Sequence, residues 1–246
     1  MDNQNTHRVA LVTGGSGGIG RAVAERLARD GMSVVVHYAG NAGRAEETVA
    51  SITGRGGRAL AARADVADAD QVEALFDTAE RAFGGVDVVA HTAGVLRLAR
   101  VAEQDLDDLD DLLRTNVRGT FAVAREAARR VRRGGAVITF SSSVVKLAFP
   151  GYAGYAASKA AVDALTPVLA GELRGRDVTV NAVAPGPTAT PLFLEGKDRE
   201  TVDRLAAQPP LERLGLPEDI AESVAFLAGP GRWINGQTVY ANGGIA

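Results

Sequence analysis

The stretch Arg8-Val-Ala-Leu-Val-Thr-Gly-Gly-Ser-Gly-Gly-Ile-Gly-Arg-Ala-Val-Ala-Glu-Arg-Leu-Ala-Arg29 decides the fold. Its first six residues form a short apolar run, which is typical of a buried strand. Five glycines follow between Gly14 and Gly20, and the residues after them place Val23 and Leu27 on one helix face. Glycines between a strand and a helix allow the tight turn and close backbone approach that a pyrophosphate requires. The stretch therefore predicts a dinucleotide-binding β-α unit.

The glycine loop satisfies two phosphate-binding patterns at once. Gly15, Gly17 and Gly20 fit Gly-x-Gly-x-x-Gly. The other pattern, Thr-Gly-x-x-x-Gly-x-Gly, begins at Thr13 and ends at Gly20. The sequence alone does not choose between these two registers. The candidate cofactor-binding residues of the loop are Gly14, Ser16, Gly18, Ile19 and Gly20.

The end of the second predicted strand, 33–37, bears on the choice between NAD and NADP. An NAD site places an acidic residue here, where it bonds the ribose hydroxyls. The stretch 37–44 contains no Asp or Glu, so a 2′-phosphate would meet no carboxylate, and this favours NADP(H) over NAD(H). Arg44 is equally well explained as a first-turn helix residue. The candidate partners of the phosphate and its ribose are Ser16, His37, Tyr38, Asn41 and Arg44.

Strands and helices alternate along the rest of the chain. Further strands are predicted at 58–63, 86–91, 136–141, 178–184 and 236–241. Helices are predicted at 44–53, 68–83, 155–172 and 217–229, and the segment 103–133 is predicted to be mostly helical. This order predicts an α/β Rossmann-type doubly wound fold, with a seven-stranded parallel sheet and helices on both faces in three α/β/α layers. Ligands of such a fold bind beyond the carboxyl ends of the strands.

A second stretch, from Ser141 to Lys159, carries candidate catalytic chemistry. Tyr155 and Lys159 are four residues apart, so a helix that begins near Tyr155 places both on one face. Tyrosine ordinarily titrates near pH 10, and a nearby ammonium would lower its pKa towards the range of efficient proton transfer. Ser142 ends an apolar strand and could polarise a carbonyl that the tyrosine protonates. The structural alternative makes Tyr155 a helix-start aromatic and Lys159 a solvated charge.

Asn116 interrupts an otherwise apolar helical pattern, although Asn is a poor helix former. Either a surface amide, or a helix kink or ordered water beside Lys159, would account for it. The arginines that follow suit solvated cations near a helix C-terminus better than nucleic-acid contacts. They are Arg125, Arg129, Arg130, Arg132 and Arg133.

Composition limits the remaining classes of function. The 246 residues are 46% hydrophobic and 23% charged, with a formal net charge of -3, so no strong field attracts nucleic acid or an anionic membrane. The absence of cysteine excludes disulfides, thiolate zinc sites and a cysteine nucleophile. His7, His37 and His91 lack ligand spacing, so no metal is expected.

The ends and apolar runs of the chain carry no membrane signal. No apolar run approaches the roughly 18 residues that span a bilayer. Residues 1–7 are polar and lack a signal-peptide core, so we expect them to form a flexible tail. We expect a cytoplasmic protein and one domain over 1–246, because the chain shows no repeat, linker or low-complexity tract.

The order and spacing of these pieces resemble a short-chain dehydrogenase/reductase of the compact single-domain type over nearly the whole chain. The sister branch of epimerases and dehydratases shares the glycine loop and Tyr-x-x-x-Lys, but the short length argues against it. The closest resemblance is to 3-oxoacyl-thioester (3-oxoacyl-ACP) reductases and related ketone reductases. The matching pieces are Thr13–Gly20, Asp65-Val66, Ala93-Gly94, Asn116, Ser142, Tyr155-x-x-x-Lys159 and Pro185-Gly186 with Thr190.

The resemblance implies roles for these residues. Tyr155 would be the acid/base, and Lys159 would lower its pKa and bond the nicotinamide ribose. Ser142 would hold the substrate oxygen, and Asn116 would anchor a water that relays protons to Lys159. The implied contacts elsewhere are Asp65 and Val66 at the adenine, Ala93 and Gly94 near the adenosine ribose, and Pro185, Gly186, Thr188 and Thr190 near the nicotinamide carboxamide.

Two positions depart from the family pattern. His91 stands where the family usually has Asn, which affects the hydrogen bonding between the fourth strand and its neighbour. Asn242 replaces a common Asp near the C-terminus.

The resemblance implies an NADP-dependent oxidoreductase that acts on the CH–OH group of a ketone/secondary alcohol pair. A small-molecule carbonyl or alcohol is the expected partner, with no nucleic acid and no membrane. Residues 187–210 would form a substrate lid, and a homotetramer or homodimer would assemble through 103–133 and 155–172. The alternatives are an NAD-preferring alcohol dehydrogenase, an epimerase or dehydratase with tightly bound NAD, and a non-catalytic NAD(P)-binding regulatory or structural protein.

Overall fold

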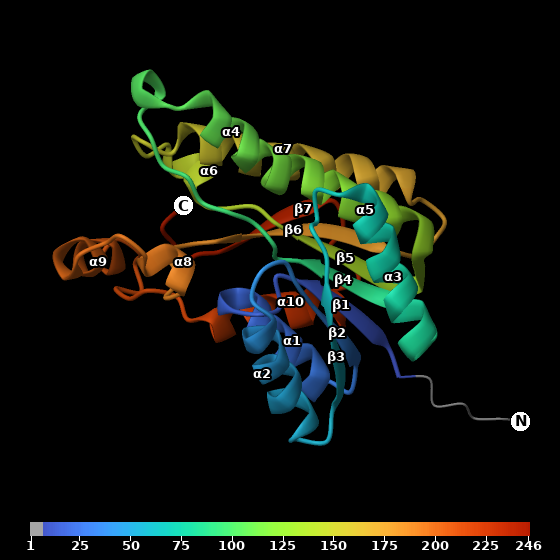
Figure 1. Ribbon diagram of the computed structural model, residues 1–246. Coiled ribbons are helices and arrows are strands. Elements are labelled where there is room, and N and C mark those ends of the chain that lie inside the picture. The colour runs from blue at the N-terminus through green and yellow to red at the C-terminus, as the bar shows by residue number, and fades with distance from the viewer. Residues whose placement is uncertain (1–6) are drawn as a thin grey trace, which may run out of the picture.

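Seven strands form one parallel sheet in the order β3-β2-β1-β4-β5-β6-β7 (Figure 1). The computed structural model describes residues 7–246, so the predicted tail lies outside the described residues except for His7. The sheet confirms the predicted doubly wound α/β fold. The strands are β1 (Val9–Thr13), β2 (Ser33–Tyr38), β3 (Arg58–Arg63), β4 (Val86–His91), β5 (Val131–Phe140), β6 (Thr179–Pro185) and β7 (Gln237–Ala241).

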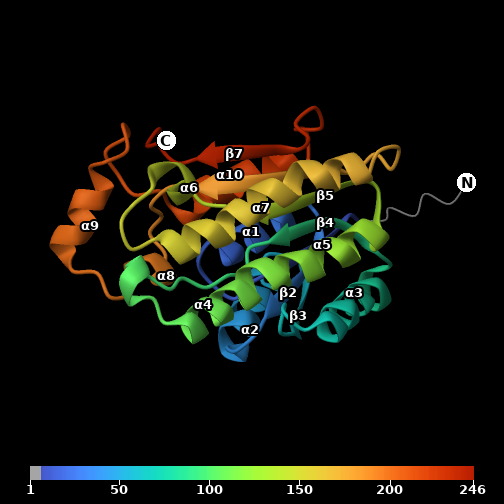
Figure 2. The same ribbon diagram turned by 90° about the horizontal axis from the view of Figure 1, so that it is seen from above.

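Helices cover both faces of the sheet, because successive side chains of each strand point to opposite faces and both sets are apolar. Val12 and Val34 belong to one buried cluster, and Leu11 and Val35 to the other. One face is covered by α1 (Gly18–Arg29), α2 (Ala42–Thr53) and α10 (Pro217–Ala228). The other is covered by α3 (Ala69–Phe83), α5 (Gly119–Arg130) and α7 (Ala153–Glu172) (Figures 1 and 2).

The chain changes direction across the sheet at β1, which pairs with β2 on one side and β4 on the other. The connections that follow the strands on the two sides of β1 therefore run in opposite directions across the sheet. A crevice forms between them at the carboxyl ends of the strands. The glycine loop lies in this crevice. Gly14 has φ +67°, and a Cβ on Gly20 would lie 2.2 Å from the Gly14 carbonyl oxygen. Only glycine fits at Gly20, and Gly14 favours it.

The segment 101–140 differs from its predicted long helix. It contains the 3₁₀ turn η1 (Val101–Glu103), α4 (Leu106–Leu113) and the π-helical turn η2 (Arg114–Arg118) before α5. Strand β5 begins at Val131 rather than Ala136, so Arg132 lies in a strand and not at a helix C-terminus. The reason is an ion pair: Arg132 Nε lies 2.8 Å from Oδ1 of Asp87 in β4, which holds the first residues of β5 beside β4.

Three short helices lie at the carboxyl end of the sheet. They are α6 (Val144–Leu147), α8 (Pro191–Leu194) and α9 (Arg199–Ala206). The last two occupy the segment predicted as a lid, and α9 projects away from the sheet (Figures 1 and 2). In the described part of the chain, no helix combines the length and apolar character needed to cross a membrane.

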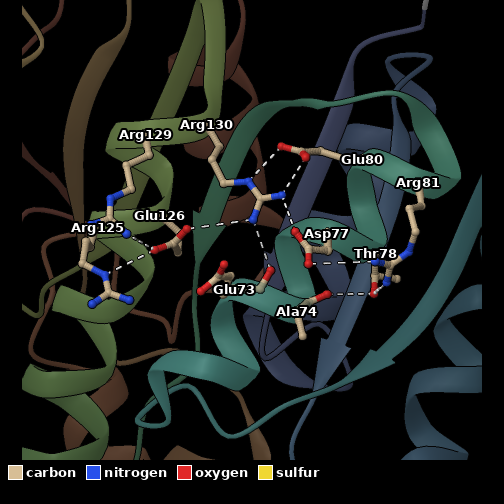
Figure 3. Close-up of polar contacts among 10 residues, drawn as sticks. All are labelled: Glu73, Ala74, Asp77, Thr78, Glu80, Arg81, Arg125, Glu126, Arg129 and Arg130. Atoms are coloured by element: carbon tan, nitrogen blue, oxygen red, sulfur yellow. Dashed lines mark hydrogen bonds and ion pairs between the residues drawn. The ribbon is translucent and has the colours of Figure 1, made fainter.

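An ion-pair network ties α3 to α5 at the side of the molecule (Figure 3). Nη2 of Arg130 lies 2.6 Å from Oδ1 of Asp77 and 2.6 Å from Oε2 of Glu80, and the Arg130 side chain is only 17% exposed. Glu126, which is 3% exposed, accepts from Arg129 at 2.9 Å. Of the predicted solvated arginines, Arg130 therefore joins α5 to α3, whereas Arg129 pairs with Glu126 within α5, since buried and partly buried charges require partners.

We expect Arg130→Met to lower the free energy of unfolding by about 1–3 kcal/mol, because it leaves partly buried carboxylates without their guanidinium. Urea unfolding at pH 7 measures the change. Arg81→Met is the control, because Arg81 is 70% exposed and lies 3.9 Å from Asp77. This control should change stability by less than about 0.5 kcal/mol. Equal effects of the two substitutions would contradict the assignment.

Candidate active site

A cavity of about 160 Å³ opens where the loops after β4, β5 and β6 meet the first turns of α7. Its base contains Ser142, Tyr155 and Lys159, and Ile19 of the glycine loop also lines it. The structure therefore brings together the three polar residues that the sequence predicts to share one site. The apolar walls come from Val95, Leu96, Val144, Leu147, Phe149, Leu192, Phe193 and Leu205.

Helix α7 begins at Ala153, so Tyr155 and Lys159 lie one turn apart on the same face, as their spacing predicts. Lys159 is 6% exposed, which excludes the alternative of a solvated charge. Its Nζ donates to the Phe140 carbonyl oxygen at 2.9 Å and lies 5.7 Å from the centre of the Tyr155 ring. Ser142 follows the end of β5 and faces the same cavity.

Burial changes the proton affinities of this pair. It raises the pKa of Tyr155 to about 12, and a hydrogen bond with Ser142 acts in the opposite direction. Burial also lowers the pKa of Lys159 to about 8, against the attraction of Asp163. The pKa of Tyr155 therefore lies above its ordinary value, because desolvation of the phenol dominates, and the lowering of this pKa by Lys159 stays a prediction. Tyr155 is protonated at neutral pH, which is the form that donates a proton.

Asn116 lies in the π-helical turn η2 and is 1% exposed, so it is not a surface amide. Its Oδ1 accepts from the Val95 N–H at 2.9 Å, and its Nδ2 donates to the Val95 carbonyl at 3.0 Å. Nδ2 also lies 3.1 Å from Oγ of Ser158, which donates to the Tyr155 carbonyl at 2.7 Å. Asn116 thus fixes the loop after β4 against the turn of α7 that carries the tyrosine.

The sequence prediction missed two supporting residues. Ser158 follows Tyr155 by three residues, and this helical spacing could have revealed it. Asn242 donates from Nδ2 to Oγ of Ser143 at 3.1 Å and to the Ala246 carbonyl at 3.1 Å. It therefore ties the C-terminus to the loop that carries Ser142. No local pattern reveals this contact, because it joins residues almost a hundred positions apart.

Apart from Tyr155 and Lys159 on α7, the predicted cofactor contacts lie at or just after the carboxyl ends of β1, β2, β3, β4 and β6, at one edge of the sheet. Gly17 is the N-cap of α1 and supplies no side-chain cap, and a Cβ placed there would have no atom within 4 Å. The N-terminus of α1 therefore has no side-chain cap and has free space beside Gly17, which suits a phosphate. Thr190 adjoins this loop, since a Cβ on Gly18 would lie 3.3 Å from its Cγ2.

The remaining contacts lie on either side of this loop. The carboxylate of Asp65 lies 2.6 Å from Nη2 of Arg114, and Val66 is buried against Gly119. Gly94 lies beside the catalytic candidates, because a Cβ there would be 3.2 Å from Oδ1 of Asn116 and 3.5 Å from Nζ of Lys159. The arrangement brings the residues predicted for the adenine end and those predicted for the nicotinamide end to the same edge of the sheet.

His37 does not lie as predicted. It is 1% exposed, its Nδ1 accepts from the Gly14 N–H at 3.1 Å, and its Nε2 lies 2.9 Å from the Ala64 carbonyl oxygen. Burial lowers its pKa, so the ring is neutral and supports the glycine loop rather than meeting a phosphate. Asn41 caps α2 by accepting from the Arg44 N–H at 3.0 Å. Arg44 is exposed and lies in the first turn of α2.

Known proteins match this chain over nearly its full length. The family model described as enoyl-(acyl carrier protein) reductase matches residues 14–246. A short-chain type dehydrogenase/reductase of Picea abies is 46% identical over 96% of this chain and 92% of its own. A 3-oxoacyl-(acyl-carrier-protein) reductase of Staphylococcus aureus is 42% identical over 96% and 97%. A short-chain dehydrogenase of Burkholderia cenocepacia, solved in complex with NADP, has a TM-score of 0.91 and 39% identity over 97% of both chains.

Burial of Lys159 predicts a pH-dependent stability. Its pKa of about 8 in the folded protein lies below the ordinary 10.5, so between these values the folded protein binds fewer protons than the unfolded chain. The contribution of Lys159 to the free energy of unfolding therefore rises with pH across this window. From pH 8 to pH 10, the wild type should gain about 2 kcal/mol relative to Lys159→Met, measured by urea unfolding. A difference that does not change with pH would show that the ammonium is not desolvated.

Proposed function

The chain belongs to the short-chain dehydrogenase/reductase family of oxidoreductases, and from this membership we propose that it transfers hydride between NADP(H) and a ketone/secondary alcohol pair. The observation that carries the proposal is the convergence of Ser142, Tyr155 and Lys159 at the base of an apolar cavity beside the glycine loop. These are the groups that a carbonyl reduction requires: a hydrogen-bond donor for the oxygen, a proton donor and a fixed cation.

The crevice fits NADP(H). The open N-terminus of α1 suits the pyrophosphate, and the stretch 37–44 offers Asn41 and Arg44 to a 2′-phosphate without any carboxylate. The Burkholderia cenocepacia relative was solved with NADP. Lys159 would hold the nicotinamide ribose, with Thr188 and Thr190 near the carboxamide. When bound, NADPH supplies the hydride.

The residues at the cavity base supply the proton and stabilise the oxygen. Ser142 donates a hydrogen bond to the substrate carbonyl oxygen, which orients and polarises it. Tyr155, protonated at neutral pH, gives its proton to that oxygen as the carbonyl carbon gains a hydride. The Lys159 ammonium stabilises the phenolate that remains and returns a proton to it. In the reverse direction the same phenolate accepts the alcohol proton.

The cavity walls favour an apolar substrate. Among the described residues that line it, Lys159 is the only one with a charged side chain. Leu192 and Phe193 of α8 and Leu205 of α9 form its outer wall, which supports a lid over 187–210. Lys146 lies 3.8 Å from the centre of the Tyr240 ring and does not line the cavity, so it is not a receptor for an acidic group.

The same proposal includes assembly into a homotetramer or homodimer. Helices α4, α5 and α7 lie side by side on one face of the molecule (Figure 2). Each exposes a large apolar side chain to solvent, and a second copy would cover such residues. These residues are Leu106, Phe121 and Val168.

Replacing Tyr155 by Phe tests the chemistry. Tyr155→Phe should lower kcat for reduction of an aryl alkyl ketone by about a thousandfold, because it removes the proton donor. The dissociation constant of NADPH should stay within about twofold. Tyr152→Phe is the matched control, since Tyr152 lines the same cavity, and it should keep most of the turnover. A Tyr155→Phe enzyme that retains wild-type turnover would refute the assignment.

Fluorescence titration at physiological salt tests the cofactor. NADPH should bind at least tenfold more tightly than NADH, a difference of about 1.4 kcal/mol. Arg44→Ala should weaken NADPH about tenfold and leave NADH unchanged, because only NADPH carries the 2′-phosphate. Arg55→Ala, beyond the other end of α2, is the control and should change neither constant. Tighter binding of NADH would instead support an NAD-preferring alcohol dehydrogenase.

A further inference from the structure

A buried chain of hydrogen bonds joins the glycine loop to Asn116 through His91. Oγ1 of Thr13, the residue before Gly14, lies 2.8 Å from Nδ1 of His91. Nε2 of His91 lies 3.1 Å from Oγ1 of Thr120, and that oxygen lies 2.6 Å from the Asn116 carbonyl oxygen. All four residues are at most 3% exposed. Water therefore does not replace these bonds at low cost.

The chemistry of the groups fixes the direction of every bond. The Asn116 carbonyl only accepts, so the Thr120 hydroxyl donates its one proton there and must accept from Nε2 of His91. Burial and the charge of Lys159 lower the pKa of His91 to about 3, so the ring is neutral and its Nδ1 accepts from Thr13. Thr13 in turn accepts from the Ala93 N–H at 3.2 Å. A single tautomer of the His91 ring, with its proton on Nε2, satisfies every hydrogen bond in the series from Thr13 to Asn116.

This series of hydrogen bonds ends at η2, the turn that carries Asn116. In η2 the Gly119 N–H bonds the Arg114 carbonyl, which is the wider spacing of a π-helix. Such turns recur at functional sites because they reorient backbone groups. Here the Thr120 hydroxyl holds the Asn116 carbonyl, while the Asn116 side chain binds the loop after β4. His91 is the ring that spans the distance from β1 to this turn.

We propose that His91 is a positioning residue, which holds the turn that carries Asn116 in place through Thr120, so that the Asn116 side chain keeps its bonds to Val95 and Ser158 and thereby fixes the turn of α7 that carries Tyr155 and Lys159. The inference rests on the proposed function of Tyr155 and Lys159. His91 touches neither substrate nor reacting atoms, and it is not among the residues that line the cavity. An Asn at this position has a shorter side chain, so it keeps an acceptor for Thr13 but does not reach Thr120.

Thr120→Val tests the link, because it preserves the shape of the side chain and removes only the hydroxyl. It should lower kcat for ketone reduction about tenfold and increase the solvent deuterium isotope effect on kcat, because proton transfer from a less precisely held Tyr155 becomes slower. The KM for the ketone and the dissociation constant of NADPH should stay within about twofold. Thr120→Ser, which restores the hydroxyl, should recover the wild-type kcat and isotope effect.

The substitution His91→Asn tests whether His91 acts through the same series of hydrogen bonds as Thr120. It should reproduce the kcat and isotope effect of Thr120→Val, and the double variant should be no slower than either single variant, because both break one chain. An unchanged isotope effect in both single variants, or additive losses in the double variant, would overturn the positioning role. A wild-type enzyme that binds NADPH but reduces no ketone would instead overturn the proposed function, and the inference with it.

Discussion

The Lys159 ammonium lies almost fully buried, 2.9 Å from the Phe140 carbonyl oxygen, where the loop after β4 approaches α7. Burial of a cation disfavours its charged form, and the surrounding groups limit that cost. Next to it the protein places a neutral imidazole at His91 and a protonated phenol at Tyr155. Both groups stay uncharged because they share the same desolvated site. The protonation states of these three groups thus follow mainly from their shared burial.

The parallel sheet makes this arrangement possible. Thr13, His91 and Phe140 end three adjacent strands, β1, β4 and β5, so residues far apart in sequence meet at one edge. The helices then add the other groups: α1 its N-terminus, η2 the Asn116 amide, and α7 both the tyrosine and the lysine. The phosphate end and the chemical end of the predicted site therefore share the frame of the sheet, and the short helices α8 and α9 line the substrate side.

Local patterns predicted much of this frame. Apolar runs and helical spacing located the seven strands, and the four-residue step from Tyr155 to Lys159 placed both in one cavity. They failed where a distant partner decides the outcome. Asp87 extends β5 back to Val131, a contact that periodicity does not contain.

The other points that local patterns did not predict also depend on residues distant in the sequence. The His37 side chain accepts a hydrogen bond from the backbone of the glycine loop. Burial raises the pKa of Tyr155, and the spacing of residues in the sequence does not reveal that burial. The cytoplasmic location, the homotetramer or homodimer and the single domain over 1–246 stay predictions.

The central claim is that the site delivers hydride to a carbonyl carbon while Tyr155 protonates the oxygen. NADPH deuterated at both C4 positions, supplied with an α,β-unsaturated aryl ketone, tests it directly, because the two double bonds of that substrate report different chemistry. We predict that NMR of the product finds deuterium on the carbinol carbon with the carbon–carbon double bond intact. Deuterium on the β-carbon of a saturated ketone would contradict the account and assign enoyl reduction instead.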